Sequence, residues 1–122
     1  MKVLICEENA VIALDLCWLL HEQGHTVCAV VKNTTACLEK VAECRPDLVM
    51  VDDDLQDGLT GLSLVETLAM LGFPAMIISG EPQSVARTTS ARAVLSKPFN
   101  DAHLASTMAR VEQGSRPQAS VG

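Results

Sequence analysis

With 122 residues, of which 48% are hydrophobic, the chain is long enough for one folded domain with a modest core. Nine Lys and Arg against fifteen Asp and Glu give a formal net charge of −6. Phosphate backbones and anionic lipid surfaces repel such a chain, so direct binding to nucleic acid or to a membrane is not expected. One Trp, two Phe and no Tyr leave an aliphatic core and too few rings to stack against single-stranded bases.

The cysteines and the first residues predict a cytoplasmic protein. An odd number of cysteines without a CxxC pair fits small reduced thiols better than a disulfide framework. The five are Cys6, Cys17, Cys28, Cys37 and Cys44. The apolar run at residues 3–6 turns acidic at Glu7, so it is too short for a signal peptide, and no run approaches the length of a membrane span.

In chain order, the apolar run at residues 3–6 predicts a strand, and residues 10–23 predict a helix that Asn9 caps and Gly24 ends. The helical spacing predicts an inner side of this helix. That side comprises Val11, Leu14, Cys17 or Trp18, and Leu20 or His21. Residues 26–31 form a second, β-branched run.

The middle of the chain continues the alternation. A helix capped by Asn33 or Thr34 is expected to reach residue 44, before Pro46. Residues 48–51 are a third apolar run, followed by three aspartates and by the turn signal Asp57-Gly58.

The last elements are shorter. Residues 61–71 predict a helix and residues 75–79 a strand, whereas the Ser/Thr-rich residues 81–92 predict at best a weak helix. A short strand at residues 93–96 precedes a last helix, capped by Asn100 and reaching residue 112.

Five apolar runs alternating with helical stretches predict an α/β fold. Continuous apolar runs are typical of parallel strands buried on both faces, and right-handed crossovers place helices on both faces of the sheet. We therefore expect a doubly wound, five-stranded parallel sheet of the flavodoxin-like type in residues 1–113, and a disordered polar tail at residues 114–122. Ligands of such sheets bind at the carboxyl ends of the strands.

Acidic and phosphate-binding side chains follow the predicted strands. They are Glu7 and Glu8, Asp52 to Asp54, Ser79, and Lys97. Clustered carboxylates repel one another unless a cation intervenes, and Mg²⁺ is the hard cation that suits oxygen ligands and phosphate. A lysine and a hydroxyl beside it would complete a cradle for a phosphoryl group, which an aspartate can accept by attacking phosphorus.

These residues resemble the receiver domain of two-component response regulators over residues 2–111. The matching segments are Glu7-Glu8, residues 46–52 ending in Asp52, the Asp57-Gly58-x-x-Gly61 loop, Ser79-Gly80, and Lys97-Pro98-Phe99. Each segment alone is weak evidence. Their common order, each at the end of a predicted strand, makes the resemblance specific.

The resemblance implies a magnesium site and a phosphoacceptor. Mg²⁺ would be held by Glu8, Asp52 and the backbone carbonyl of Asp54, and through water by Glu7. Asp52 would take the phosphoryl group from the phosphohistidine of a histidine kinase or a phosphotransfer protein.

The phosphorylated form would then switch contacts with a downstream protein of unknown identity. Lys97 and Ser79 would contact the phosphoryl group. Enzymatic activity would be limited to self-phosphorylation and autodephosphorylation. Because the chain starts at Met1 and ends in a short tail, a single-domain regulator is favoured over a receiver excised from a larger kinase or transcription factor, which would have nearly the same sequence pattern.

Four positions and one segment depart from the family pattern or tune it. Glu8 stands where the family usually has Asp. Val94 stands where it commonly has a Tyr or Phe that moves with the switch hydroxyl, and the segment from Ser79 to Lys97 is short. Asp54 and Glu81 occupy positions that tune hydrolysis of the phosphoryl group.

Other functions fit the sequence less well. The main alternative is a degenerate receiver that docks proteins without phosphorylation, which Glu8, Val94 and the weak fourth helix favour. A flavin-type cofactor binder would need a glycine-rich phosphate loop and flanking aromatics. The zinc-protease pattern His-Glu-x-x-His at residues 21–25 has Gly24 between its histidines, and no calcium-loop spacing is satisfied.

Overall fold

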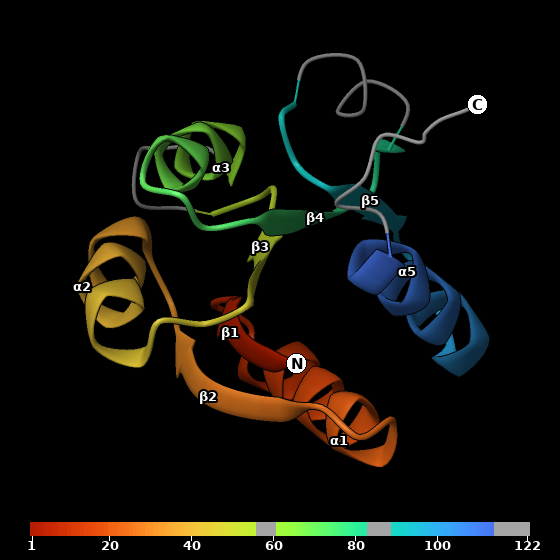
Figure 1. The fold of residues 1–122 in the computed structure, drawn as a ribbon. Helices are drawn as coiled ribbons and strands as arrows, with labels where there is room; N and C mark the ends of the chain where they lie inside the picture. The colour runs from red at the N-terminus through yellow and green to blue at the C-terminus, as the bar shows by residue number, and fades with distance from the viewer. Residues whose placement is uncertain (56–60, 83–88, 114–122) are drawn as a thin grey trace.

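A computed structural model describes residues 1–55, 61–82 and 89–113. Its strands are β1 (Lys2–Cys6), β2 (Thr26–Val31), β3 (Leu48–Asp52), β4 (Ala75–Ser79) and β5 (Ala93–Ser96). They pair in parallel in the order β2-β1-β3-β4-β5 (Figure 1). The predicted doubly wound parallel sheet is confirmed.

Helices cover both faces of the sheet. They are α1 (Ala10–Glu22), α2 (Thr34–Cys44), α3 (Gly61–Met70) and α5 (Asp101–Gln113). Helices α1 and α5 lie on one face and α2 and α3 on the other (Figure 1). The predicted Asp57-Gly58 turn, most of the weak helix at residues 81–92 and the tail at residues 114–122 lie outside the described residues. No helix in the described ranges is long and apolar enough to cross a bilayer.

Alternation along the strands divides the core into two layers. In β1, Leu4 and Cys6 pack on the α2/α3 side, whereas Val3 and Ile5 pack on the α1/α5 side. The residues of β3 alternate between the two layers in the same way, and all five of them are buried. A strand that buries both faces must be apolar throughout, which explains why the continuous runs of the sequence predict these strands correctly.

Asparagine side chains cap three helices, as predicted. Asn9 Oδ1 accepts hydrogen bonds from the amides of Val11 and Ile12 at 3.0 and 3.1 Å. Asn33, and not Thr34, caps α2, because its Oδ1 accepts the Ala36 amide at 2.8 Å. In the same way Asn100 accepts the His103 amide at 2.9 Å. These side chains satisfy amide groups that have no partner inside the helix.

The predicted inner side of α1 is correct for Leu20 and Cys17 but wrong for the other residues. Val11, Leu14 and Trp18 are 77%, 72% and 60% exposed, and the residues that α1 buries are Ala13, Leu16 and Leu20. Because α1 is apolar around most of its circumference, its spacing supports more than one choice of inner face. The sheet selects the face with the small Ala13, and the bulky row is left in solvent.

The strand order creates a crevice at one edge of the sheet. From β1 the chain moves outward to β2 and then back past β1 to β3, so β1 and β3 are neighbours whose connections run to opposite sides. The carboxyl ends of β1 and β3 therefore flank a topological switch point, which is where ligands of such sheets bind.

Candidate functional site

Three of the predicted site residues come together at the switch point. Glu7 directly follows β1, Asp52 ends β3, and Lys97 directly follows β5. Lys97 Nζ lies 3.0 Å from Asp52 Oδ1, and the Lys97 amide donates to the Ser79 carbonyl at 2.8 Å. The peptide bond between Lys97 and Pro98 is cis. Residues that are 45 positions apart in the sequence thus form a partly buried ion pair.

Asp52 is held in its charged form. The side chain of Asp52 is buried, and the residue is only 5% exposed. Its Oδ1 accepts a hydrogen bond from the Asp54 amide at 3.1 Å and another from the Lys97 ammonium. Burial alone would raise the pKa of the Asp52 carboxyl, but hydrogen bonds with Glu7, Lys97 and the Asp54 amide lower it below its ordinary value. The pKa of Lys97 is raised, because its contacts with Asp52 outweigh the effect of its own burial. The ion pair is therefore fully charged at neutral pH.

Glu7 faces the same carboxylate. Glu7 is 2% exposed. Its Oε2 accepts a hydrogen bond from the Asn9 amide at 3.1 Å. Its other oxygen, Oε1, is buried and has no hydrogen-bond partner in the described part of the chain. Burial and the neighbouring Asp52 carboxyl raise the pKa of Glu7 to about 7. A buried carboxylate oxygen without a donor, beside a second carboxylate, is an acceptor that a cation would satisfy.

In the metal-free protein, the free energy of unfolding is expected to fall as the pH rises from about 4.5 to about 7. Over this interval the folded chain keeps a proton on Glu7 that the unfolded chain has released, and raising the pH destabilises the state that binds more protons. The expected loss is on the order of 2–3 kcal/mol. Denaturant unfolding in the presence of a chelator, for the wild type and Glu7→Gln, measures it.

The comparison with Glu7→Gln isolates this carboxyl. Burial lowers the pKa of His25, so His25 changes stability in the opposite direction near the same pH, but it does so equally in both proteins. A stability difference between wild type and Glu7→Gln that stays constant across the interval would contradict the assignment.

The remaining acids suit a partly hydrated cation. Glu8 is half-buried and Asp54 exposed at the same edge. Within the described ranges, no group of three or more His, Cys, Asp or Glu side chains is close enough to hold a metal ion by side chains alone. Magnesium usually binds through one or two carboxylates and keeps several waters, so this donor set fits Mg²⁺ and does not fit an ion that needs a closed protein cage.

Ser79 is buried at the end of β4, next to β3, but its hydroxyl is engaged locally. Its Oγ accepts the Glu81 amide at 2.9 Å, and the Glu81 side chain is exposed. A hydroxyl that accepts one hydrogen bond can still donate its own hydrogen. Val94 is half-buried on β5 and packs against the core layer on the α2/α3 side.

Gly61 has a role at the site that the sequence motif does not reveal. A Cβ atom at this position would lie 2.7 Å from the Asp53 Cα and closer still to the Asp52 carbonyl oxygen. The first turn of α3 therefore packs directly on the backbone that carries Asp52, at a distance only glycine allows.

The zinc-protease pattern is excluded as a metal site. His21 is exposed on α1, whereas His25 lies beyond Gly24, whose φ is +88°. His25 is buried, and its Nδ1 lies 3.0 Å from the amino terminus of Met1. The two histidines are thus not on one continuous helix.

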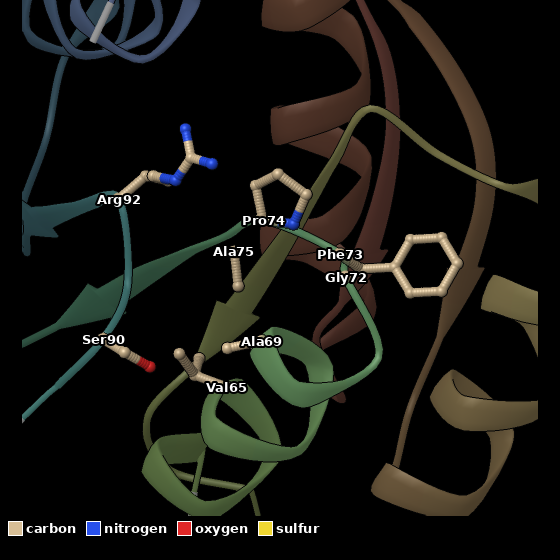
Figure 2. Close-up of a pocket in the computed structure, with 8 residues that line it drawn as sticks. All are labelled: Val65, Ala69, Gly72, Phe73, Pro74, Ala75, Ser90 and Arg92. Atoms are coloured by element: carbon tan, nitrogen blue, oxygen red, sulfur yellow. The ribbon is translucent and has the colours of Figure 1, made fainter. Parts of the chain in front are cut away.

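A separate cavity of about 160 Å³ lies at the opposite edge of the sheet (Figure 2). It is bounded by the end of α3, the residues that lead into β4, and Ser90 and Arg92 ahead of β5. Because β4 begins here and ends at Ser79, the length of a strand separates this cavity from the acidic residues.

Comparison with known proteins agrees with this fold. Residues 3–109 match the response regulator receiver domain. The chain therefore belongs to the receiver-domain family of two-component response regulators. It is 28% identical over 113 residues to the phyllosphere-induced regulator PhyR of Methylorubrum extorquens, covering 89% of this chain and 42% of PhyR. It is 37% identical over 81 residues to the two-component response regulator PhoP of Pseudomonas aeruginosa, covering 65% of this chain and 35% of PhoP. The chain thus spans less than half the length of these relatives.

Solved structures show the same fold. The receiver domain of PhyR from Erythrobacter litoralis superimposes with a TM-score of 0.81 at 27% identity, over 92% of this chain and 89% of that one. The signal receiver domain of a modulated diguanylate cyclase from Desulfovibrio desulfuricans superimposes with a TM-score of 0.80 at 24% identity, over 93% and 94% of the two chains.

Proposed function

We propose that residues 1–113 form a cytoplasmic phosphoacceptor unit in which Asp52 takes a phosphoryl group from a phosphohistidine, in a reaction that requires Mg²⁺. The donor would be a histidine kinase or a phosphotransfer protein, and the product would switch contacts with a downstream protein. The observation that carries the proposal is the Asp52–Lys97 ion pair at the switch point of a receiver fold. It places an ionised nucleophile beside a cation that can bind phosphoryl oxygens.

The same edge would hold the metal. Glu8, Asp52 and the Asp54 carbonyl would bind Mg²⁺ directly and Glu7 through water, which would give the buried Glu7 Oε1 a partner. Bound there, the ion supplies positive charge that neutralises the phosphoryl oxygens.

Side chains of this protein would carry out the other steps of phosphoryl transfer. An Asp52 oxygen forms the new bond to phosphorus while the bond from phosphorus to the histidine nitrogen breaks, and the histidine leaves with its electron pair. The Lys97 ammonium then pairs with phosphoryl oxygens. Ser79 donates its hydroxyl hydrogen to the same group, and its Oγ can accept the Glu81 amide at the same time. Asp54 and Glu81 flank the site and tune the hydrolysis that returns Asp52 to its free form.

A second candidate function is docking without phosphorylation. Val11, Leu14 and Trp18 form an exposed apolar row on α1, and α1 begins just after the Glu7-Glu8 pair. Exposed apolar patches of this kind commonly mark contacts with other proteins. Such a contact does not need a phosphoryl group, and Val94 supplies no aromatic ring to connect the site to the surface.

Beryllofluoride, which mimics a phosphoryl group on aspartate, separates the two candidates. With Mg²⁺ it is expected to raise the melting temperature of the wild type, because it binds the folded state alone. It is also expected to change the fluorescence of Trp18. Asp52→Asn should show neither response. A wild type that responds in neither assay would favour the docking module.

A further inference from the structure

Four of the five cysteines form two pairs between α2 and the sheet. Hydrogen bonds join the thiols of Cys6 and Cys37, and those of Cys28 and Cys44. Both pairs belong to the core layer on the α2/α3 side, whereas Cys17 packs on the opposite layer with α1. The sequence shows only single, widely spaced cysteines, so the fold creates the pairing.

A β-bulge directs Cys28 toward α2. In the pairing of β1 with β2, Val3 faces Val27 and Leu4 faces Ala29, so Cys28 is the extra residue. Cys28 and Val31 both pack on the α2/α3 side although they are three positions apart, which strict alternation forbids and a bulge allows. The bulge thus places the Cys28 sulfur against the end of α2.

The outer pair is accessible and lies near the Lys2 ammonium. Cys44 is the last residue of α2, and its carbonyl accepts Lys2 Nζ at 2.7 Å. Cys28 and Cys44 are both half-buried. Cys6 and Cys37, in contrast, are 0% exposed, so no solute reaches the inner pair without unfolding.

The Cys28 thiol is hydrogen-bonded to Cys44. Burial and this hydrogen bond raise the pKa of Cys28 to about 11. Disulfide exchange proceeds through a thiolate, which either cysteine of the pair can supply by losing its proton to solvent.

The arrangement favours oxidation over metal binding. In the described part of the chain no three or more cysteines, histidines or carboxylates come close enough to hold a metal ion, so the two pairs do not merge into one four-thiolate site. A disulfide needs two cysteines held close together, and Cys28 and Cys44 are hydrogen-bonded neighbours on different elements.

We propose that Cys28 and Cys44 are a dithiol that low-molecular-weight disulfides oxidise reversibly to an intramolecular disulfide. One cysteine of the pair, as its thiolate, attacks one sulfur of the oxidant, whose sulfur–sulfur bond breaks and releases one thiolate. The sulfur of the other cysteine then attacks the first in the mixed disulfide, loses its proton and releases the second thiolate. Two electrons pass from the cysteine pair to the oxidant, which leaves as two thiols. The product joins the end of α2 covalently to the edge strand β2.

Oxidised glutathione tests the proposal on the full chain. Under denaturing conditions the reduced protein should titrate five thiols, and the treated protein three, with no glutathione attached and full recovery in dithiothreitol. Peptide mass mapping should find a Cys28–Cys44 link. Cys28→Ala should instead retain glutathione on Cys44, and the control Cys17→Ala should lose two thiols as the wild type does.

The peptide mass map of the oxidised wild type tests the proposal even where a variant folds poorly. An unchanged count of five thiols, a stable glutathione adduct on the wild type, or a link through Cys6, Cys17 or Cys37 would each overturn the proposal.

Discussion

Lys97→Ala is expected to slow phosphorylation of Asp52 by acetyl phosphate and Mg²⁺ about 10- to 100-fold, because a charge-assisted hydrogen bond contributes roughly 1.5–3 kcal/mol. Lys97 Nζ lies 3.0 Å from Asp52 Oδ1, and Asp52 is buried. Lys97→Ala removes the ammonium that stabilises the negative charge on the oxygens of the phosphoryl group during its transfer. Initial rates of adduct formation measure the effect.

Lys40→Ala is the matched control. Lys40 forms an ion pair with Glu43 at 3.4 Å on the surface of α2, far from Asp52 in the fold. Its loss removes the same charge from the chain but should leave the phosphorylation rate within about twofold of the wild type. Equal rates in Lys97→Ala and Lys40→Ala would remove Lys97 from the reaction.

Gly61→Ala is expected to lower the free energy of unfolding by about 1–3 kcal/mol, which is the typical cost of overpacking. The new Cβ would meet backbone atoms of Asp52 and Asp53, and backbone cannot rotate away as a side chain can. Relief of the clash must move either α3 or the end of β3. We therefore also expect slower phosphorylation. Urea unfolding measures the stability change.

Gly80→Ala provides the control at a glycine of the same edge. A Cβ at Gly80 meets nothing within 4 Å, so this change should alter stability by less than about 0.5 kcal/mol. If Gly61→Ala were as stable as Gly80→Ala, the close packing of α3 on Asp52 would be wrong.

Strand positions were predictable because burial on both faces leaves a simple sequence signal. All residues of β3 and β4 are buried, and both appear in the sequence as unbroken apolar runs. Once the strands are parallel, Glu7, Asp52 and Lys97 must lie at one edge, so the composition of the candidate site follows from the strand ends. The helix caps were predictable for a local reason, since an asparagine side chain reaches the amides two or three residues ahead.

Tertiary packing decides what the sequence left open. The face that α1 buries depends on the shape of the sheet below it, and an apolar helix does not encode that choice. The bulge at Cys28 and the turn that engages the Ser79 hydroxyl arise from single backbone adjustments without a periodic signal. The state of Glu7 depends on Asp52, which is 45 residues away in the chain, and on the absence of a donor for Oε1 in the described residues.

The central claim is that Asp52 carries the phosphoryl group, and the most direct test is to map the adduct formed with acetyl phosphate and Mg²⁺. The wild type should gain one phosphoryl group that is stable in acid, labile in base and located on the peptide with Asp52, and Asp52→Asn should gain none. An adduct that persists in Asp52→Asn, or that maps to another residue, would contradict the account.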